Sequence, residues 1–514
     1  MNLLFLHPTP GLGRQRAYFQ ACQLLTQSKA ARCVFVYNGP ECPGLDGDVP
    51  VYHFDSWVAQ NTTAIQVADI DALERKYAKS NLWLAAVSER QISNYSLLNG
   101  SYRTIRYSQA EQLHLLKALV LFFEHVIKAE QIDAILAHHP DNIFSTMLFE
   151  MCESRVQVPF LLFPDYYWQQ DRYLAFDSKY FTSARMTQRY HDLYAQYDTQ
   201  VAPRMAEAEA YLAPRRAKDP SVIRKDLLPK LTLGKNLRNA VATFRAKKGW
   251  ISLRRPDVLK AHSQSWLPVL LRAFLTRNMN LIGHQLSRHF LRDMPTGPYV
   301  YLPLQRVPEA AMLTRSTGYL NQLSLVQVLS ASLPSGYTLV VKDHPKSRGY
   351  HPTSYYRAMS DLPNVVVMDD TFPNDGLLEG ANLIVTVGGT LGMQQLFTGK
   401  PILMFGRKYY EVMEGVMRVR DLNDLPYRLK DILVNGVTVE RATCERSLHA
   451  FVLALIDCSY IVADQTKTLH QNPEALAQLV ADILATEITD MVSTKRAAYA
   501  VAQDAPTPAE AALT

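Results

Sequence analysis

The stretch LVVKDHPKSRG, residues 339–349, joins a short apolar run to an abrupt change of chemistry. Residues 339–341 are of the kinds found in buried strands, and Lys342-Asp343-His344-Pro345 follows at once. Such a strand either simply reaches solvent or delivers a ligand-binding loop. The sequence on both sides distinguishes these alternatives.

Around this stretch, apolar runs alternate with helical patterns from residue 299 to residue 406. The predicted strands are YVYLPL (299–304), YTLVVK (337–342), NVVVMDD (364–370), NLIVTV (382–387) and PILMFG (401–406). The segments between them read as helices, among them 321–333 and 390–399. This alternation predicts a doubly wound parallel sheet of the Rossmann type.

A second α/β unit precedes it. Residues 2–13, 32–38, 133–139 and 158–165 read as strands or strand-loop units, with a helix predicted from Arg14 to Ser28. We therefore predict an α/β protein in which two Rossmann-like domains face a cleft. The expected boundaries are 1–180, a helical basic connector at 181–294, a second domain at 295–490 and a disordered tail at 491–514.

Composition and charge indicate where the protein is located and what kind of partner it has. The chain has 514 residues, 48% of them hydrophobic, and its six cysteines form no CxxC pair. With no signal peptide and no apolar run of about 20 residues, we expect a cytoplasmic protein with reduced thiols. Residues 215–260 hold fourteen Lys/Arg against three Asp. This stretch predicts either a solvated arm or an anionic partner, namely lipid headgroups at the inner face of the membrane, a charged polymer or nucleic acid. Of these partners we favour the membrane surface, and we expect no nucleic acid.

Three predicted strand ends carry the candidate binding residues. Glycines that open a helix let a ligand approach the backbone, and cationic or imidazole donors one strand away would add to a phosphate site. Each feature alone also fits a plain turn, a helix cap or a structural histidine. The candidates are Gln305, Lys342, His344, Pro345, Thr386, Gly388, Gly389, Thr390 and Gln394.

Several common functional motifs are absent. The chain has no P-loop, no G-x-S-x-G elbow and only the fragment GLGRQRA of a dinucleotide fingerprint. The run AHHPD at 137–141 lacks further ligands at metal spacing. We therefore expect no metal and no cofactor.

Residues 299–410 resemble the capsule polysaccharide biosynthesis family, which includes the bacterial β-Kdo transferases. The similar motifs are PLQRVPEA (303–310), VKDHP (341–345), VGGTLGMQQ (387–395) and GKPILMFG (399–406), in the family's order. The chain departs at Asp343, where Glu is usual, at Gly388, where Thr is usual, and at Gln394-Gln395, where Glu-Ala is usual.

The resemblance implies a GT-B glycosyltransferase of capsule or lipopolysaccharide biosynthesis with a nucleotide-sugar donor. In characterised members this donor is CMP-Kdo, so a CMP-linked sugar is favoured. His344 and Pro345 match the family's nucleotide-contacting pair, Gly389 and Thr390 match its phosphate-side pair, and Gln305 matches its Gln near the nucleotide. The acceptor would be a glycan or a lipid-linked glycan.

A retaining transfer needs a carboxylate nucleophile or its equivalent. The candidate catalytic residues are Asp165, which has aromatic neighbours, and Asp141, Asp171 and Glu309. Three alternatives stay open: a transferase of polyol phosphate from a CDP donor, a sugar-nucleotide epimerase, and a non-catalytic scaffold of polysaccharide assembly. The sequence leaves the donor, acceptor, linkage, stereochemical outcome and oligomeric state undetermined.

Overall fold

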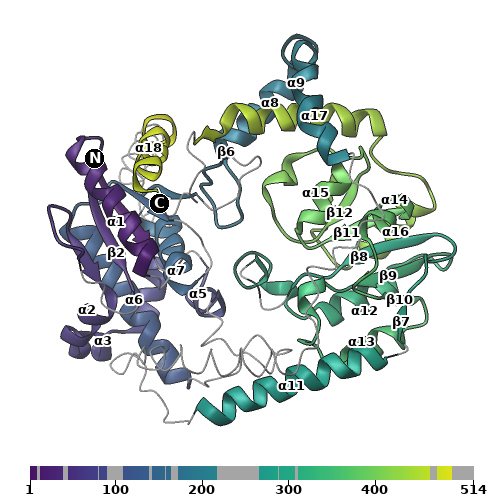
Figure 1. Ribbon diagram of the computed structural model, residues 1–514, viewed down its shortest axis with the longest axis horizontal. Coiled ribbons are helices and arrows are strands. Elements are labelled where there is room, and N and C mark those ends of the chain that lie inside the picture. The colour runs from purple at the N-terminus through teal and green to yellow at the C-terminus, as the bar shows by residue number, and fades with distance from the viewer. Residues whose placement is uncertain are drawn as a thin grey trace, which may run out of the picture.

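The computed structural model describes residues 1–7, 12–38, 44–78, 80–88, 108–137, 142–156, 158–163, 172–216, 266–287, 289–306, 309, 311–462 and 472–488. Within these ranges the chain forms two parallel sheets, each covered by helices on both faces (Figure 1). The predicted α/β class with two Rossmann-like domains is confirmed.

The first sheet has the order β3-β2-β1-β4-β5, with all neighbours parallel. Its apolar strands are buried on both faces, as expected for a parallel sheet. One face packs against α1 and α18 (Pro473–Ile483), and the other packs against α6 and α7. The strands are β1 (Asn2–His7), β2 (Arg32–Tyr37), β3 (Val51–His53), β4 (Ala134–Ala137) and β5 (Phe160–Leu162), and the helices are α1 (Leu12–Gln27), α2 (Phe54–Gln60), α3 (Thr62–Val67), α4 (Ile70–Tyr77), α5 (Trp83–Ser88), α6 (Gln109–Ala129) and α7 (Ile143–Met151).

The second sheet has the order β13-β12-β11-β8-β9-β10-β7, again all parallel. Helices α12, α13 and α16 cover one face, and α14 and α15 cover the other. The strands are β7 (Phe290–Leu291), β8 (Tyr299–Pro303), β9 (Thr338–Lys342), β10 (Val365–Met368), β11 (Leu383–Thr386), β12 (Ile402–Met404) and β13 (Val416–Arg418), and the helices are α12 (Gln322–Ser332), α13 (Thr353–Ser360), α14 (Asn374–Gly380), α15 (Thr390–Leu396) and α16 (Leu425–Leu433).

Helices outside the sheets join the two domains. α8 (Ala184–Ala195) and α9 (Met205–Arg216) pack against α17 (Arg441–Cys458), and Tyr190 and Ser447 share a hydroxyl hydrogen bond of 2.8 Å. The short strands β6 (Arg172–Tyr173) and β14 (Tyr460–Ile461) pair antiparallel nearby. The long helix α11 (Trp266–Leu286) runs along one margin of the molecule (Figure 1). Short helical turns lie at Cys152–Val156, Tyr197–Val201, Ala202–Arg204, Ala311–Arg315, Thr317–Tyr319, Pro345–Ser347, Tyr409–Val412 and Leu484–Ile488.

The structure differs from the prediction at the C-terminal end of the second domain, which we expected to extend to residue 490. Helix α18 (Pro473–Ile483) instead packs on the first domain, where Leu476, Val480 and Ile483 join the core beside Tyr18 of α1. The short strands β3, β7 and β13 were not predicted, because two or three residues carry too little pattern.

Two further predictions lie outside the described residues: the tail 491–514 and most of the basic stretch 215–260. Among the helices that the structure describes, none is long and apolar enough to cross a bilayer.

Candidate functional site

The candidate site lies at the carboxyl edge of the second sheet. β8 is central, with β9 on one side and β11 on the other, so the chain changes direction across the sheet at β8. Open α/β sheets bind ligands in the crevice outside such a switch point. Gln305, His344 and Gly389 each follow one of these three strands.

The turn after β11 is held from inside by Thr386. Its buried Oγ1 accepts hydrogen bonds from the N–H groups of Gly388 and Gly389, each at 3.1 Å. Gly388 has φ +113°, and a Cβ there would lie 3.2 Å from the carbonyl oxygen of Arg407. A glycine is therefore required at 388. Thr386 and Gly388 therefore determine the shape of the turn. The Thr386 hydroxyl faces inward, toward the backbone of the turn.

Two residues that the sequence did not single out also hold this turn. The buried Tyr410 donates its hydroxyl hydrogen to the Gly389 carbonyl oxygen at 2.6 Å. The Ser316 hydroxyl donates to the carbonyl oxygen of Val387 at 3.3 Å. Both contacts join segments far apart in the chain, so no local pattern pointed to them.

Gln305 and Gly389 are in direct contact across neighbouring strands. A Cβ built on Gly389 would lie 2.9 Å from Oε1 and 3.0 Å from Cδ of Gln305, and closer still to Nε2. The backbone of Gln305 is fixed by the buried Gln322, which accepts from its N–H at 2.6 Å and donates to its carbonyl oxygen at 2.7 Å. The predicted association of these two strand ends is thus present in the structure.

Helix α15 begins directly after this contact. Gly389 is its N-cap residue in an extended conformation, with φ −74° and ψ 167°, and Thr390 is exposed at the first helical position. Gln394 is half-buried one turn further on. The next residue, Gln395, is buried, and the Oε1 atom of Gln395 has no hydrogen-bond partner among the described residues.

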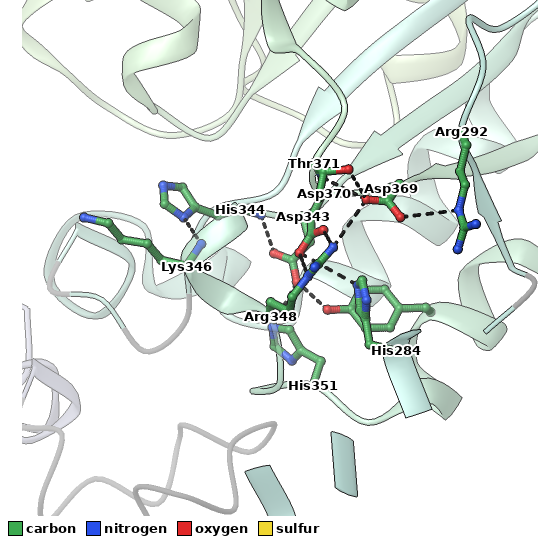
Figure 2. Close-up of polar contacts among 11 residues, drawn as sticks. His284, Arg292, Asp343, His344, Lys346, Arg348, His351, Asp369, Asp370 and Thr371 are labelled. Carbon is green, nitrogen blue, oxygen red and sulfur yellow. Dashed lines mark hydrogen bonds and ion pairs between the residues drawn. The ribbon is translucent and has the colours of Figure 1, made fainter. Parts of the chain in front are cut away.

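The loop after β9 turns one imidazole nitrogen outward. The Nδ1 atom of His344 accepts from the N–H of Lys346 at 3.1 Å, so the ring hydrogen sits on Nε2. Burial lowers the pKa of His344, and Asp343 and Glu309 oppose that shift. The lowered pKa favours the neutral ring, which offers one N–H donor. Figure 2 shows it pointing away from the polar cluster behind it.

Asp343 stabilises this loop from within. Its Oδ1 accepts from the backbone N–H of His344, and its Oδ2 accepts from the hydroxyl of the buried Tyr356, both at 2.7 Å. Pro345 begins the short helical turn that follows. Asp343 therefore orients the backbone that carries His344.

Arg348 ties the same loop to the end of β10. Its guanidinium binds both carboxylate oxygens of Asp370 and one of Asp369 (Figure 2). Burial raises the pKa of Asp370 to about 6 and lowers that of His284 to about 4. A pocket of about 310 Å³ opens beside this cluster, lined by His284, Gln285, Arg292, Arg348, Asp369, Thr371 and Phe372.

Lys342 takes a different position from the one we predicted. Its side chain is buried, and its amine donates to Oδ1 of Asn374, the first residue of α14, at 2.7 Å. The Tyr301 hydroxyl donates to the same oxygen at 3.0 Å. Burial lowers the pKa of Lys342 to about 8, against the effect of nearby carboxylates. Lys342 thus joins β9 to α14 and is not presented at the edge of the sheet.

The predicted carboxylates of the first domain, Asp141, Asp165 and Asp171, lie outside the described residues. Glu309 is described, is half-buried and lies close enough to His344 to affect its pKa. No group of three or more His, Cys, Asp or Glu is arranged to hold a metal within the described ranges.

A larger pocket, of about 580 Å³, lies between the two domains. Its first-domain wall contains the buried pair Lys179–Glu150, with a distance of 2.5 Å between Nζ and Oε1. Arg407, which follows β12 of the second sheet, stacks on Tyr180 with 4.5 Å from its Cζ to the ring centre. The full lining is Ser80, Leu84, Phe149, Glu150, Glu153, Asp177, Ser178, Lys179, Tyr180 and Arg407.

Comparisons with solved structures return remote likenesses. Thermosulfurimonas dismutans KpsC, a beta Kdo 2,7 transferase, is 11% identical with a TM-score of 0.32, over 70% of this chain and 89% of that one. The spinosyn rhamnosyltransferase SpnG complexed with thymidine diphosphate is 12% identical with a TM-score of 0.25, over 88% and 96%. A putative UDP-N-acetylglucosamine 2-epimerase from Listeria monocytogenes is 9% identical with a TM-score of 0.25, over 95% and 96%. Such scores carry no argument about activity.

Comparison by sequence is more specific. No curated protein matches the chain. The model of the family described as "Capsule polysaccharide biosynthesis protein" matches residues 296–431. This range contains the ends of β8, β9 and β11, with Gln305, His344 and Gly389. The predicted resemblance is thereby confirmed: residues 296–431 carry the sequence pattern of the capsule polysaccharide biosynthesis proteins.

Proposed function

We propose that this protein is a glycosyltransferase of bacterial surface polysaccharide biosynthesis, of capsule or lipopolysaccharide. It transfers a sugar from a nucleotide donor, and a CMP-linked sugar such as Kdo is the first candidate. The observation that carries this proposal is the meeting of three strand ends within the family-matched range. There the Gln305 amide lies against Gly389, exposed Thr390 follows directly in the chain, and His344 follows β9, the strand beside β8 on its other side.

In this proposal the three side chains hold the phosphate of the departing nucleotide. The His344 imidazole, the Gln305 amide and the Thr390 hydroxyl are neutral donors on a rigid edge. Preorganised donors stabilise the charge that develops on a leaving group. Pro345 sets the loop, and Gln394 lies one helical turn from the phosphate. The nucleotide sugar is a substrate, and the reaction needs no separate cofactor.

The facing domain supplies the acceptor side. A pocket that combines carboxylates, cations and aromatic rings, as between Glu150, Lys179 and Tyr180, suits the hydroxyl groups and apolar faces of a sugar. We propose that a glycan or lipid-linked glycan enters here. Asp165, Asp141 and Asp171 remain the candidate nucleophiles or bases, and Glu309 is a fourth.

We further propose that the enzyme works in the cytoplasm at the inner face of the membrane, with the basic stretch 215–260 near anionic lipid. Two of its cations are already engaged: Arg216 pairs with Glu209 and Glu445, and Arg215 stacks on Tyr211 at 3.6 Å. The remaining Lys and Arg residues would carry the attraction.

A nucleotide screen tests the proposal. Thermal shift with CMP, CDP, UDP and CMP-Kdo should give the largest stabilisation with cytidine nucleotides, and calorimetry should confirm one site. Products from labelled donor would separate glycosyl transfer from polyol-phosphate transfer and from epimerisation. A chain that binds no nucleotide would be the non-catalytic scaffold instead.

A further inference from the structure

The C-terminal half of helix α11, residues 275–286, exposes four apolar side chains and buries the polar Asn278 and His284. Leu275, Met279, Ile282 and Leu286 are 52%, 66%, 36% and 77% exposed. Their spacing of four, three and four residues places them along one face of the helix. Surface helices of globular proteins show the opposite pattern, with polar residues outward. We call these four residues the α11 apolar face.

The opposite side of α11 is fixed to the second domain. Asn278, Leu281 and His284 are buried. The Asn280 amide donates to the carbonyl oxygen of Gly349 at 3.3 Å, and the His284 ring lies 4.2 Å from that of Phe290. These contacts determine which side of the helix faces outward. Because the other side of α11 is packed against the second domain, the α11 apolar face points toward solvent.

We propose that the α11 apolar face docks on an anionic lipid bilayer, with α11 lying in the plane of the interface. Helices with an apolar face and positive charge nearby bind such surfaces. The chain directly before α11, residues 217–265, contains twelve Lys/Arg and three Asp in its sequence. A stretch of sequence with this charge is attracted to anionic headgroups. This docking site rests on the membrane placement proposed above and names the surface that makes the contact, whereas it does not depend on the transfer reaction.

A second copy of the chain fits this face less well. From Leu275 to Leu286 the face is only about 17 Å long at ~1.5 Å per residue. Stable protein interfaces use about 20–30 residues on each side. The chain also has a net charge of +6, so two copies repel each other at long range. An anionic bilayer can bind an apolar face of this length, and its negative charge is complementary to the basic sequence that precedes α11.

The test is co-sedimentation of the full chain with vesicles. One set contains phosphatidylcholine and phosphatidylglycerol at about 3:1, and the other contains phosphatidylcholine alone. The face variant is Leu275→Gln, Met279→Gln and Leu286→Gln, which removes apolar groups without changing net charge; glutamine also keeps good helix propensity. The matched control is Leu422→Gln, Val434→Gln and Val437→Gln, whose side chains are 44%, 58% and 63% exposed elsewhere.

We expect wild type and control to bind the anionic vesicles alike, and the face variant to bind at least tenfold more weakly. Circular dichroism and nucleotide affinity should match in all three proteins. Binding of the face variant at the wild-type level overturns the proposal, as does a wild type that ignores both vesicle types. Light scattering after size-exclusion chromatography tests whether a second copy of the chain binds the α11 apolar face instead. If the wild type is a dimer and the face variant is a monomer, the face is a dimer interface and the lipid proposal is overturned.

Discussion

Replacing Gly389 by Ala tests whether Gln305 touches the donor. The backbone at 389 has φ −74° and ψ 167°, which alanine adopts without strain. The new Cβ would lie 2.9 Å from Oε1 and 3.0 Å from Cδ of Gln305, and its three nearest atoms all belong to that side chain. The fold should therefore survive, while the Gln305 amide must move away from the turn.

The size of the effect follows from the lost hydrogen bond. A hydrogen bond to a charged group contributes about 1.5–3 kcal/mol, so nucleotide affinity should fall by about 10- to 150-fold. Gln305→Ala should cost the same amount. The double variant Gly389→Ala/Gln305→Ala should cost no more than either change alone, because both remove one interaction.

The assay is isothermal calorimetry with the nucleotide that gives the largest thermal shift. Gly336→Ala is the matched control, since a Cβ there meets nothing within 4 Å. Wild-type affinity in folded Gly389→Ala would refute the contact between Gln305 and the donor. Additive losses in the double variant would show that Gly389 acts by another route.

Three further changes probe the same edge. His344→Ala should weaken nucleotide binding by about 1.5–3 kcal/mol through loss of its Nε2–H donor; an unchanged calorimetric affinity would remove His344 from the site. Thr386→Val should lower the free energy of unfolding by about 1–3 kcal/mol in urea melts, because two N–H groups of the turn lose their acceptor; equal midpoints would contradict this. Lys342→Met tests a pH effect: the folded pKa of about 8 lies below the ordinary 10.5, so wild-type stability should rise by up to about 3 kcal/mol from pH 8 to 10.5. That rise should be missing in the variant, and a parallel rise in both proteins would exclude Lys342 as its source.

Much of the candidate site could be predicted because parallel strands end at one edge of a sheet. Gln305 and Gly389 are 84 positions apart in the numbering, yet their strands were recognisable, and adjacency at the edge followed from the fold class. The fold class did not determine which of the two glycines of the turn adopts a positive φ, and Gly389 is in fact extended. The left-handed residue of the turn is Gly388, and only the backbone geometry distinguishes the two glycines.

By itself, the sequence determined the alternation of strands and helices, the two α/β domains and the polar residues that follow each strand. These features depend on local periodicity, and local periodicity is readable along the chain. Only the tertiary structure decided that Lys342 is buried on Asn374, that Tyr410 and Ser316 hold the turn, and that α18 returns to the first domain. It also decided that α11 faces outward with its apolar side. Burial and long-range hydrogen bonds depend on which distant segments pack together, and a pattern within one segment does not contain that information.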